Sequence, residues 1–344
     1  MNFPRLGVLL NAEYSAAELI RLGVLAEELG YRSLMYVDVR FHRECYIGLA
    51  SVAVHTKRIL LATGVTDPYS RHPAITAAAV ATLDELSDGR AGLGLGLGGA
   101  GFKELGIHKM LPVAALRESI GVIRRLWRGE EVTLEGKVIS LAKGQLQFTP
   151  VRDRIPIVIA TQGEQISRLS GELADGVLIA NTVSEAGLDF YVRQIADGAA
   201  KAGRPASDVD IDLRWEVCIS EDEAAALRVM RRRLAQRMIA SYPHWAFLKQ
   251  LGVSASSEFE AIAARKDPAS LDAATEALPM DVVSASVLAG SPDRVAARIA
   301  PLLRSEVSGV TIRPHACPGT GVEEVMRSFI QDVMPLAAER RLVA

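Results

Sequence analysis

Small and polar residues follow a series of short apolar segments along the chain, and residues of these types could bind a ligand or handle a proton. Asp38, for example, directly follows the apolar segment Ser33–Val37. When such segments are parallel strands of a closed barrel, their carboxyl ends meet on the face where ligands bind. The candidates at these ends are Asp38, Thr63, Gly64, Val65, Gly98, Gly99, Thr161, Gln162, Gly163, Ala180, Asn181, Trp215, Glu216, Arg313 and His315.

Two of these positions indicate a specific chemistry. The carboxyl group of Asp38 could hold or release a proton, although an aspartate after a strand is equally often a turn residue or a helix cap. The segment Thr161–Glu164 precedes a predicted helix, so its N–H groups and the helix dipole form an anion site. The hydroxyl of Thr161 could also cap this helix, and the two roles are compatible.

A second type of signal is the glycine pattern of Ala91–Gly98, in which glycine alternates with leucine. One face of this predicted strand carries no side chains, which leaves room for another backbone or for a flat ligand. Gly96–Gly101 also fits the G-x-G-x-x-G pattern of dinucleotide-binding proteins. That motif should open a helix directly, and the next predicted helix begins only near Pro112, so we interpret the segment as a strand end that lines a cofactor.

The elements that position these residues alternate regularly. Strands are expected near residues 6, 34, 60, 92, 157, 178, 214 and 310, with helices between them. Eight strand–helix units without a break in composition predict a single α/β domain over residues 1–344, a (β/α)8 barrel rather than an open doubly wound sheet. Residues 132–146 are expected to form a hairpin outside the repeat. Ser241–Val283 contains short helical pieces and is expected to be a cap inserted between the seventh and eighth strands.

Composition excludes several classes of protein. The net charge of −2 gives no basic surplus for general nucleic-acid binding. No apolar run reaches the length of a membrane span, and the first residues lack the layout of a signal peptide. Three cysteines far apart, without a CxxC pair, argue against a disulfide framework or a zinc site, and we expect a reducing cytoplasm. His72 stands without a second ligand at metal spacing, so we expect a structural residue and no metal.

Two sequence blocks carry a resemblance to a known family. They are Thr63-Gly-Val-Thr-Asp-Pro-Tyr-Ser-Arg-His-Pro73 and Leu83-Asp-Glu-Leu-Ser-Asp-Gly-Arg90, the latter followed by the glycine–leucine strand. The chain resembles the luciferase-like flavin and deazaflavin oxidoreductases. Within them it is most similar to the F420-dependent methylenetetrahydromethanopterin reductase branch. The resemblance runs from Leu6 to about Leu336 and is weaker over residues 240–285.

The resemblance implies a cofactor and a reaction. The cofactor would be coenzyme F420, or alternatively FMN, bound without a covalent bond. The reaction would be hydride transfer to or from a small organic substrate, and the substrate that the resemblance implies is a methylenetetrahydropterin. The resemblance places Asp38 beside the cofactor ring, a non-prolyl cis peptide at Gly64–Val65 behind it, and the cofactor phosphate at Thr161–Gly163 and the following strand end, Ala180–Asn181.

The catalytic and substrate residues follow from the same positions. The family often has histidine directly after the aspartate, whereas this chain has Val39 there and His42 four residues after Asp38. Asp38 and His42 are therefore the catalytic candidates. The residues expected to contact the substrate are Tyr69, Trp215 and Arg313.

Two other functions stay open from the sequence. An FMN-dependent monooxygenase would need a reductase partner and would consume oxygen rapidly with its substrate. A barrel that binds a cofactor without catalysis would show binding but no turnover. Family resemblance and the alanine-rich helix Ala74–Leu86 suggest a homodimer packed through the side of the third and fourth strands, with no nucleic-acid or membrane partner.

Overall fold

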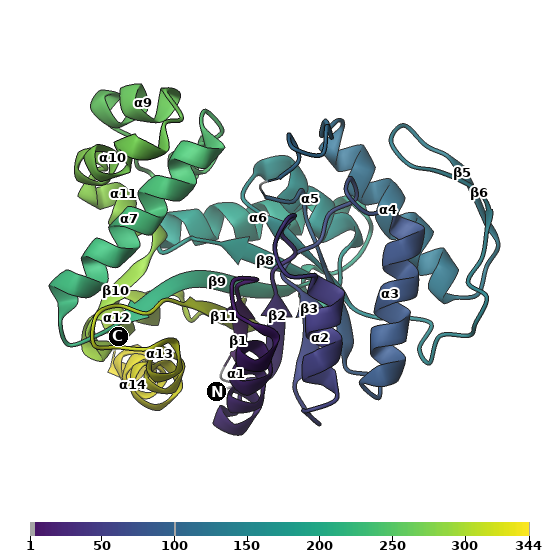
Figure 1. Ribbon diagram of the computed structural model, residues 1–344, viewed down its shortest axis with the longest axis horizontal. Helices are drawn as coiled ribbons and strands as arrows, with labels where there is room; N and C mark the ends of the chain where they lie inside the picture. Colours follow the sequence, from purple (N-terminus) through teal and green to yellow (C-terminus); the bar gives the residue numbers. More distant parts are fainter. Residues whose placement is uncertain (1–3, 100, 344) are drawn as a thin grey trace. The chain divides into compact units, whose positions relative to one another are not determined.

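The computed structural model describes residues 4–99 and 101–343, and its fold is the predicted (β/α)8 barrel (Figure 1). The eight barrel strands are those predicted from the sequence. They are β1 (Arg5–Leu10), β2 (Ser33–Tyr36), β3 (Leu60–Thr63), β4 (Ala91–Leu95), β7 (Ile157–Thr161), β8 (Gly176–Ala180), β9 (Asp210–Ile219) and β11 (Gly309–Pro314). They pair in the order β9-β11-β1-β2-β3-β4-β7-β8, and β8 pairs with β9, which closes the ring.

The chain divides into two compact units whose boundaries fall inside strands. The amino-terminal unit comprises residues 5–178 and 194–211. The carboxy-terminal unit comprises, among the described residues, Pro4, residues 179–193 and residues 212–343. Because β8 and β9 each contribute residues to both units, the division does not follow a linker. A single domain over the whole chain stays a prediction.

Helices of the amino-terminal unit begin where the sequence signals place them. α1 (Ala16–Leu29) starts with a capping box between Ser15 and Glu18 and ends at Gly30, whose φ is 92°. α3 (Pro73–Leu86) is capped by the ring of His72, which accepts a hydrogen bond from a backbone N–H. The lone histidine is therefore structural, as predicted. The other helices are α2 (Cys45–Ala53), α4 (Pro112–Trp127), α5 (Glu164–Leu173) and α6 (Glu185–Lys201), the last shared with the carboxy-terminal unit.

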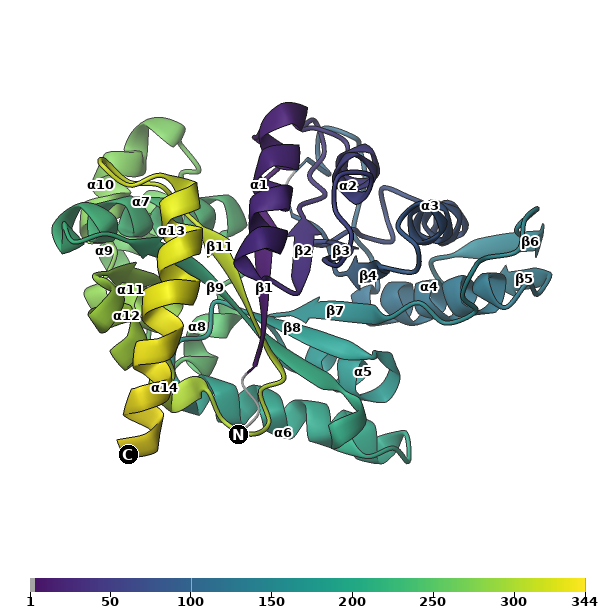
Figure 2. The ribbon, with the colours of Figure 1, turned by 90° about the horizontal axis from the view of Figure 1, so that it is seen from below.

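Apolar side chains fill the interior of the amino-terminal strands. Leu9, Met35 and Leu178 form a buried cluster, and Val65 and Ala160 pack against it. On the outside, α2, α3 and α4 lie side by side (Figure 1). The predicted hairpin, β5 (Val132–Glu135) and β6 (Ser140–Gly144), lies beyond α4 (Figure 2). Because the interior is filled, a ligand of this unit has to bind at the strand ends.

The predicted insertion is a group of short helices packed on α7 (Glu223–Ser241), as Figure 1 shows for α9 to α11. Its helices are α8 (Ala246–Gln250), α9 (Ser257–Ala264), α10 (Leu271–Ala277) and α11 (Met280–Ser286). Trp245, Phe259 and Leu278 are buried together with Leu234 and Met238 of α7. The insertion therefore shares one apolar core with α7 and with Cys218 of β9.

Two details of the carboxy-terminal unit differ from the prediction. β10 (Leu288–Gly290) pairs in parallel with β9 and was not predicted, because three residues are too few to show an alternating pattern. α12 (Pro292–Ile299) follows it. The last helix is divided into α13 (Val322–Ser328) and α14 (Met334–Val343) by a π-helical turn between them. None of the helices in the described part of the chain combines the length and apolar character needed to cross a bilayer.

Candidate functional site

Asp38 lies two residues after the end of β2 and accepts a hydrogen bond from Thr66, a residue of the loop after β3. The hydroxyl of Thr66 donates a hydrogen bond to Asp38, with an Oγ1–Oδ2 distance of 2.6 Å. Thr66 is fully buried and Asp38 is half-buried. Burial raises the pKa of Asp38 above its ordinary value, and the Thr66 bond and the charges of Arg71 and Arg40 offset this only in part. Asp38 therefore keeps its proton to a higher pH than a surface aspartate, as a group that transfers protons requires.

Asp67 fixes the loop after β3. Its Oδ1 accepts hydrogen bonds from the backbone N–H groups of Tyr69 and Ser70, each at 2.8 Å. Its Oδ2 accepts the Ser70 hydroxyl at 2.7 Å and pairs with the guanidinium group of Arg40. Arg40 also stacks on the ring of Phe102, 4.1 Å from the centroid. Since Asp67 is wholly buried, these contacts hold the loop in one conformation.

The bond between Gly64 and Val65 is a cis peptide, as the resemblance implied. Val65 lies against the glycines at the end of β4: a Cβ at Gly96, directly after this strand, would lie 2.7 Å from Val65 Cγ2. A Cβ at Gly94 would lie 1.9 Å from the carbonyl oxygen of Thr63. The sequence predicted that the bare face would make room either for another backbone or for a flat ligand. At Gly94 it makes room for the backbone of β3. At Gly96 the space holds the side chain of Val65.

Gly98 and Gly99 turn the chain after β4. Gly98 has a φ of 68°, and a Cβ there would lie 2.5 Å from the ring of Phe102. Tyr69 meets this ring edge-on, with 6.2 Å between centroids, and its hydroxyl donates to the carbonyl of Met110 at 3.0 Å. Gly99 is exposed, and no described atom outside its chain neighbours lies within 4 Å of its Cβ position. The surface over Gly99 is therefore open.

The predicted anion site lies at the start of α5. The Thr161 hydroxyl is 3.0 Å from the Ser167 hydroxyl and accepts the Gly163 N–H at 3.3 Å. Gly163 is the N-cap and offers no side chain to the first turn, while Gln162 is exposed. Within the described chain, only the neighbours of Gly163 come within 4 Å of its Cβ position. The helix thus begins at an open end, where its dipole favours an anion.

In the carboxy-terminal unit, Glu216 of β9 is the centre of a buried charge cluster. Its Oε1 accepts hydrogen bonds from Arg214 Nη1 at 2.6 Å and Arg313 Nη1 at 3.2 Å. Its Oε2 lies 2.5 Å from His315 Nε2. Arg214 Nη2 also donates a hydrogen bond to Asn181 Oδ1 at 2.7 Å, so the amide oxygen of this predicted site residue already has a partner. Glu216 therefore joins β9 to β11 and to the loop after it.

The charges of this cluster follow from its surroundings. Burial disfavours the ionised form of Glu216, but the guanidinium groups of Arg313 and Arg214, with the His315 bond, hold its pKa well below the usual range. Burial lowers the pKa of His315 in spite of the Glu216 carboxylate beside it. At neutral pH an ionised Glu216 therefore accepts a hydrogen bond from a neutral imidazole.

Two predicted site residues differ in exposure: Trp215 is buried and His42 is exposed. The indole of Trp215 is wholly buried and donates to the Thr182 carbonyl at 2.7 Å, so it cannot contact a ligand in this conformation. Its neighbour Glu216 lines a cavity instead. His42 is exposed in the loop after β2, and its role stays a prediction.

Sequence reasoning missed several residues that build these sites. Thr66 and Asp67 lie inside the eleven-residue block, and an aspartate before proline is a signal for a loop that bonds its own backbone. Arg214 interrupts an apolar strand, and a charge at such a position needs a buried partner. Phe102 gave no comparable signal.

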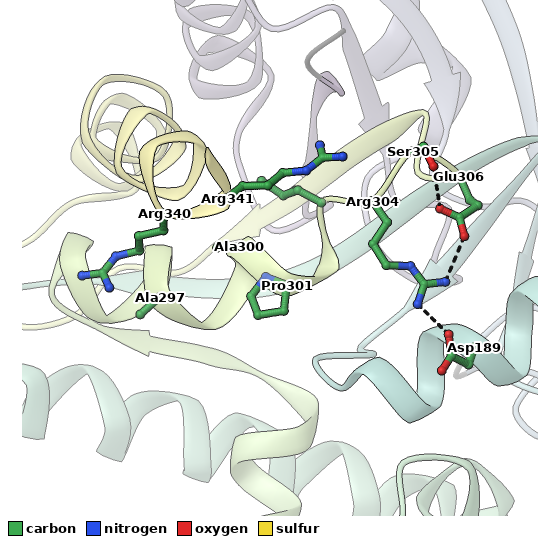
Figure 3. Close-up of a pocket in the computed structure, with 10 residues that line it drawn as sticks. Asp189, Ala297, Ala300, Pro301, Arg304, Ser305, Glu306, Arg340 and Arg341 are labelled. Atoms are coloured by element: carbon green, nitrogen blue, oxygen red, sulfur yellow. Dashed lines mark hydrogen bonds and ion pairs between the residues drawn. The ribbon is translucent and has the colours of Figure 1, made fainter. Parts of the chain in front are cut away.

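The cavity drawn in Figure 3 has a volume of about 890 Å³ and lies in the carboxy-terminal unit. Its lining includes Arg304, Ser305 and Glu306, which precede β11 and therefore lie at the amino end of that strand. Barrel enzymes bind ligands at the opposite, carboxyl ends. We therefore do not assign the active site to this cavity, despite its size.

A sequence model of luciferase-like monooxygenases matches residues 2–308. The chain belongs to the luciferase-like monooxygenase family. This is the family that the two sequence blocks indicated.

Individual members of the luciferase-like family are similar over most of the chain. A 5,10-methylenetetrahydromethanopterin reductase of Methanolobus tindarius is 35% identical, over 81% of this chain and 84% of its own length. An F420-dependent glucose-6-phosphate dehydrogenase of Rhodococcus hoagii is 30% identical, over 96% of this chain and 97% of its own. The solved structure of the coenzyme F420-dependent tetrahydromethanopterin reductase of Methanopyrus kandleri matches with a TM-score of 0.84 and 27% identity, covering 97% of this chain and 99% of that one.

Proposed function

We propose that this luciferase-like protein is an F420-dependent oxidoreductase that transfers a hydride between the deazaflavin and a small organic substrate. The observation that carries the proposal is that a relative named for F420 dependence matches 96% of the chain. Other relatives are named for reduction of 5,10-methylenetetrahydromethanopterin. A one-carbon carrier of the methylenetetrahydropterin type is therefore the substrate we propose.

The strand ends of the amino-terminal unit fit a cofactor with a flat ring and an anionic tail. The open start of α5 at Gly163 suits a phosphate, because its first N–H groups have no side-chain cap. The open surface over Gly99 leaves room for a ring. We assign the phosphate to Thr161, Gln162 and Gly163, and the ring to Thr63, Gly64, Val65, Gly98 and Gly99. Ala180 and Asn181 stay predicted phosphate contacts.

In this proposal the protein supplies position and a proton. When bound, the deazaflavin gives or takes the hydride at its ring. Asp38 carries the accompanying proton on Oδ1, since Oδ2 accepts the Thr66 hydroxyl. The raised pKa of Asp38, caused chiefly by burial, keeps the acid form available at higher pH. His42 is exposed and could exchange protons with water, which is the role we assign to it.

Substrate contacts are proposed for two of the predicted residues. Tyr69 lies beside Phe102 in the loop after β3, and Arg313 lines a cavity at the end of β11. Both positions are at carboxyl ends of strands, where barrel enzymes hold their substrates. The buried indole of Trp215 is not included.

The test is a separate titration of the purified protein with F420 and with FMN, followed by absorbance and fluorescence. We expect saturable F420 binding and, with reduced F420, oxidation of the cofactor on addition of a methylenetetrahydropterin. Matched titrations of Gly163→Asp should show weaker F420 binding, because a carboxylate would occupy the anion site. Binding of FMN alone would contradict the proposal.

An FMN-dependent monooxygenase is the second candidate, favoured by solved monooxygenases that share the fold. Rapid oxygen consumption by the FMN-loaded, reduced protein in the presence of substrate would establish it in place of the first. Binding of F420 without turnover on any substrate would instead indicate a cofactor-binding barrel without catalysis.

We also propose a homodimer formed through α2 and α3. Ile47 of α2 and Ile75 and Leu86 of α3 are exposed apolar side chains of the amino-terminal unit, as is Val54 after α2. Such a group is typical of a protein interface. Sedimentation at micromolar concentration should show a dimer, and Ile75→Glu should shift it to a monomer. The three free, buried cysteines suit the cytoplasm, which is the compartment we propose.

A further inference from the structure

Two cavities of the carboxy-terminal unit are lined by arginines, and they differ in how those arginines are paired. In the cavity of Figure 3, Arg304 pairs with Asp189 and Glu306, with shortest N–O distances of 2.6 Å and 3.2 Å. Arg340 pairs with Asp293 at 2.6 Å, and its side chain points away from Arg304 (Figure 3). Acidic side chains therefore already neutralise two of the three arginines in this lining, Arg304 and Arg340, and among the described residues Arg341 alone of the three is without an ion pair.

The second cavity, about 220 Å³, lies between α7 and the end of β11. Three guanidinium groups line it, those of Arg233, Arg237 and Arg313, whereas Glu216 is the only acid in the lining. The remaining lining residues are His315, Met230, Leu234, Gln236, Ala240 and Val287. A mostly apolar wall with a few convergent charged groups is typical of a small-molecule site.

The single carboxylate of the cavity is already shared. Glu216 accepts hydrogen bonds from Arg214 and Arg313 and is bonded to His315. Arg237 Nη1 is 3.9 Å from Glu216 Oε1, beyond hydrogen-bond distance, and Arg237 Nη2 is buried without a hydrogen-bond partner. Within the described residues Arg233 forms no ion pair. The cavity therefore has an excess of positive charge and an unused buried donor.

We propose that this cavity binds an oxyanion group, a carboxylate or a phosphate, of a small-molecule ligand. If the protein is the oxidoreductase proposed above, this ligand is its substrate. Guanidinium groups bind such groups through paired N–H donors, and Arg237 Nη2 would gain the acceptor that it lacks. An anion would also reduce the repulsion among the arginines. Burial, together with the charges of Arg214 and Arg313, lowers the pKa of Arg237 to about 10 even though Glu216 opposes the shift.

The test is calorimetric titration of the full-length protein with inorganic phosphate and, separately, with acetate, at low ionic strength. We expect saturable binding by at least one of the two probes, and this binding should persist in Gly163→Asp, in which a carboxylate occupies the phosphate site proposed at the start of α5. The tighter probe identifies the group on the ligand. Sodium chloride at matched ionic strength should not reproduce the heat. Absence of saturable binding by both probes would overturn the proposal.

Variants of α7 distinguish anion binding in the cavity from a general effect of the protein's charge. Arg237→Gln should weaken anion binding by about 10- to 100-fold, the effect expected for loss of one charged hydrogen bond. Arg237→Lys should restore part of it. Arg232→Gln is the matched control, because the neighbouring Arg232 pairs with Asp272 and does not line the cavity. Equal affinities of Arg237→Gln and the wild type would overturn the proposal. If Arg237→Gln does not unfold cooperatively, Arg233→Gln, at an exposed position, takes its place.

Failure of this proposal can be told apart from failure of the proposed function. Arg237→Gln should bind F420 as the wild type does, because the proposed ring and phosphate residues do not include Arg237. Saturable phosphate or acetate binding without F420 binding would overturn only the F420 assignment. F420 binding and turnover without anion binding would overturn only the cavity.

Discussion

Asp38 and Glu216 are both buried or half-buried carboxyl groups at the carboxyl ends of barrel strands, yet their pKa values are shifted in opposite directions. Around Asp38, in the amino-terminal unit, burial outweighs a single hydroxyl donor and the more distant charges of Arg71 and Arg40, so the pKa rises. Around Glu216, in the carboxy-terminal unit, guanidinium groups and a histidine outweigh burial, so the pKa falls.

The difference shows that neighbours, rather than burial alone, determine what a carboxyl group can do. A carboxyl group with a raised pKa exchanges its proton under mild conditions and suits acid–base chemistry. A carboxylate bonded by two arginines stays ionised and instead fixes the direction of its partners. We therefore assign proton transfer to Asp38, and we assign to Glu216 the orientation of Arg313 and His315.

Loss of the ionisable group of Asp38 should affect the reaction most strongly. Asp38→Asn keeps the acceptor for Thr66 but removes the proton, so we expect the rate of hydride transfer to fall by about 10²- to 10⁴-fold. F420 affinity should change little. Stopped-flow measurement of cofactor oxidation gives both quantities. The exposed Asp153→Asn is the control and should leave the rate unchanged. A normal rate in Asp38→Asn would transfer the role to His42, which His42→Ala would then test.

The second effect is on stability. Glu216→Gln leaves the guanidinium group of Arg214 buried without its counter-charge, so we expect a loss of about 3–5 kcal/mol in the free energy of unfolding. Urea denaturation at pH 7 measures this loss. The exposed Glu135→Gln should cost far less. If Glu216→Gln is as stable as the wild type, the negative charge of Glu216 does not contribute to the free energy of unfolding.

The difference in unfolding free energy between the wild type and Glu216→Gln should depend on pH. The folded-state pKa of Glu216 lies below the ordinary value of 4.5, so its charge contributes stability above pH 4.5 that is lost as the pH falls through the folded-state value. The difference in stability between the wild type and Glu216→Gln should therefore narrow on acidification. A constant difference would show that the lost stability comes from packing.

The hydrogen bond from Thr66 to Asp38 makes a smaller contribution. Thr66→Val removes the hydrogen bond that favours the ionised carboxylate, so the pKa of Asp38 should rise further. The limb of the pH–rate profile that reports Asp38 should move to higher pH. Thr82→Val, on the surface of α3, serves as the control, since its hydroxyl bonds only within the helix. An unchanged profile in Thr66→Val would remove Asp38 as the titrating group.

The fold could be predicted because each strand–helix unit carries its own local signals. Ser15 and Glu18 mark the start of α1, and Gly30 marks its end, without reference to the rest of the chain. The strand ends could also be located, which is why the candidate residues lie at the ends of β2, β3, β4 and β7. β10 was missed because it has only three residues.

The partners of the site residues could not be predicted to the same extent. Glu216 meets Arg313 because β9 and β11 pair with these two residues opposite each other. That register is a long-range property, and no local pattern states it. The choice between Trp215 and Glu216 is similar, because neighbouring residues on a strand point to opposite faces. Only the packing shows that the indole is inside and that the carboxylate faces the cavity.

Val65 lies beside Gly94 of β4 and Gly96 directly after this strand, and this packing restricts the order in which substitutions at these positions can be tolerated. Alanine at Gly96 would bring a methyl group to 2.7 Å from Val65 Cγ2, a side-chain atom that a smaller residue would remove. At Gly94 the obstacle is a backbone oxygen, which no substitution at another position removes. Gly96→Ala should therefore be tolerated once Val65 has been replaced by a smaller residue. Gly94→Ala should not be tolerated, whatever residue occupies position 65.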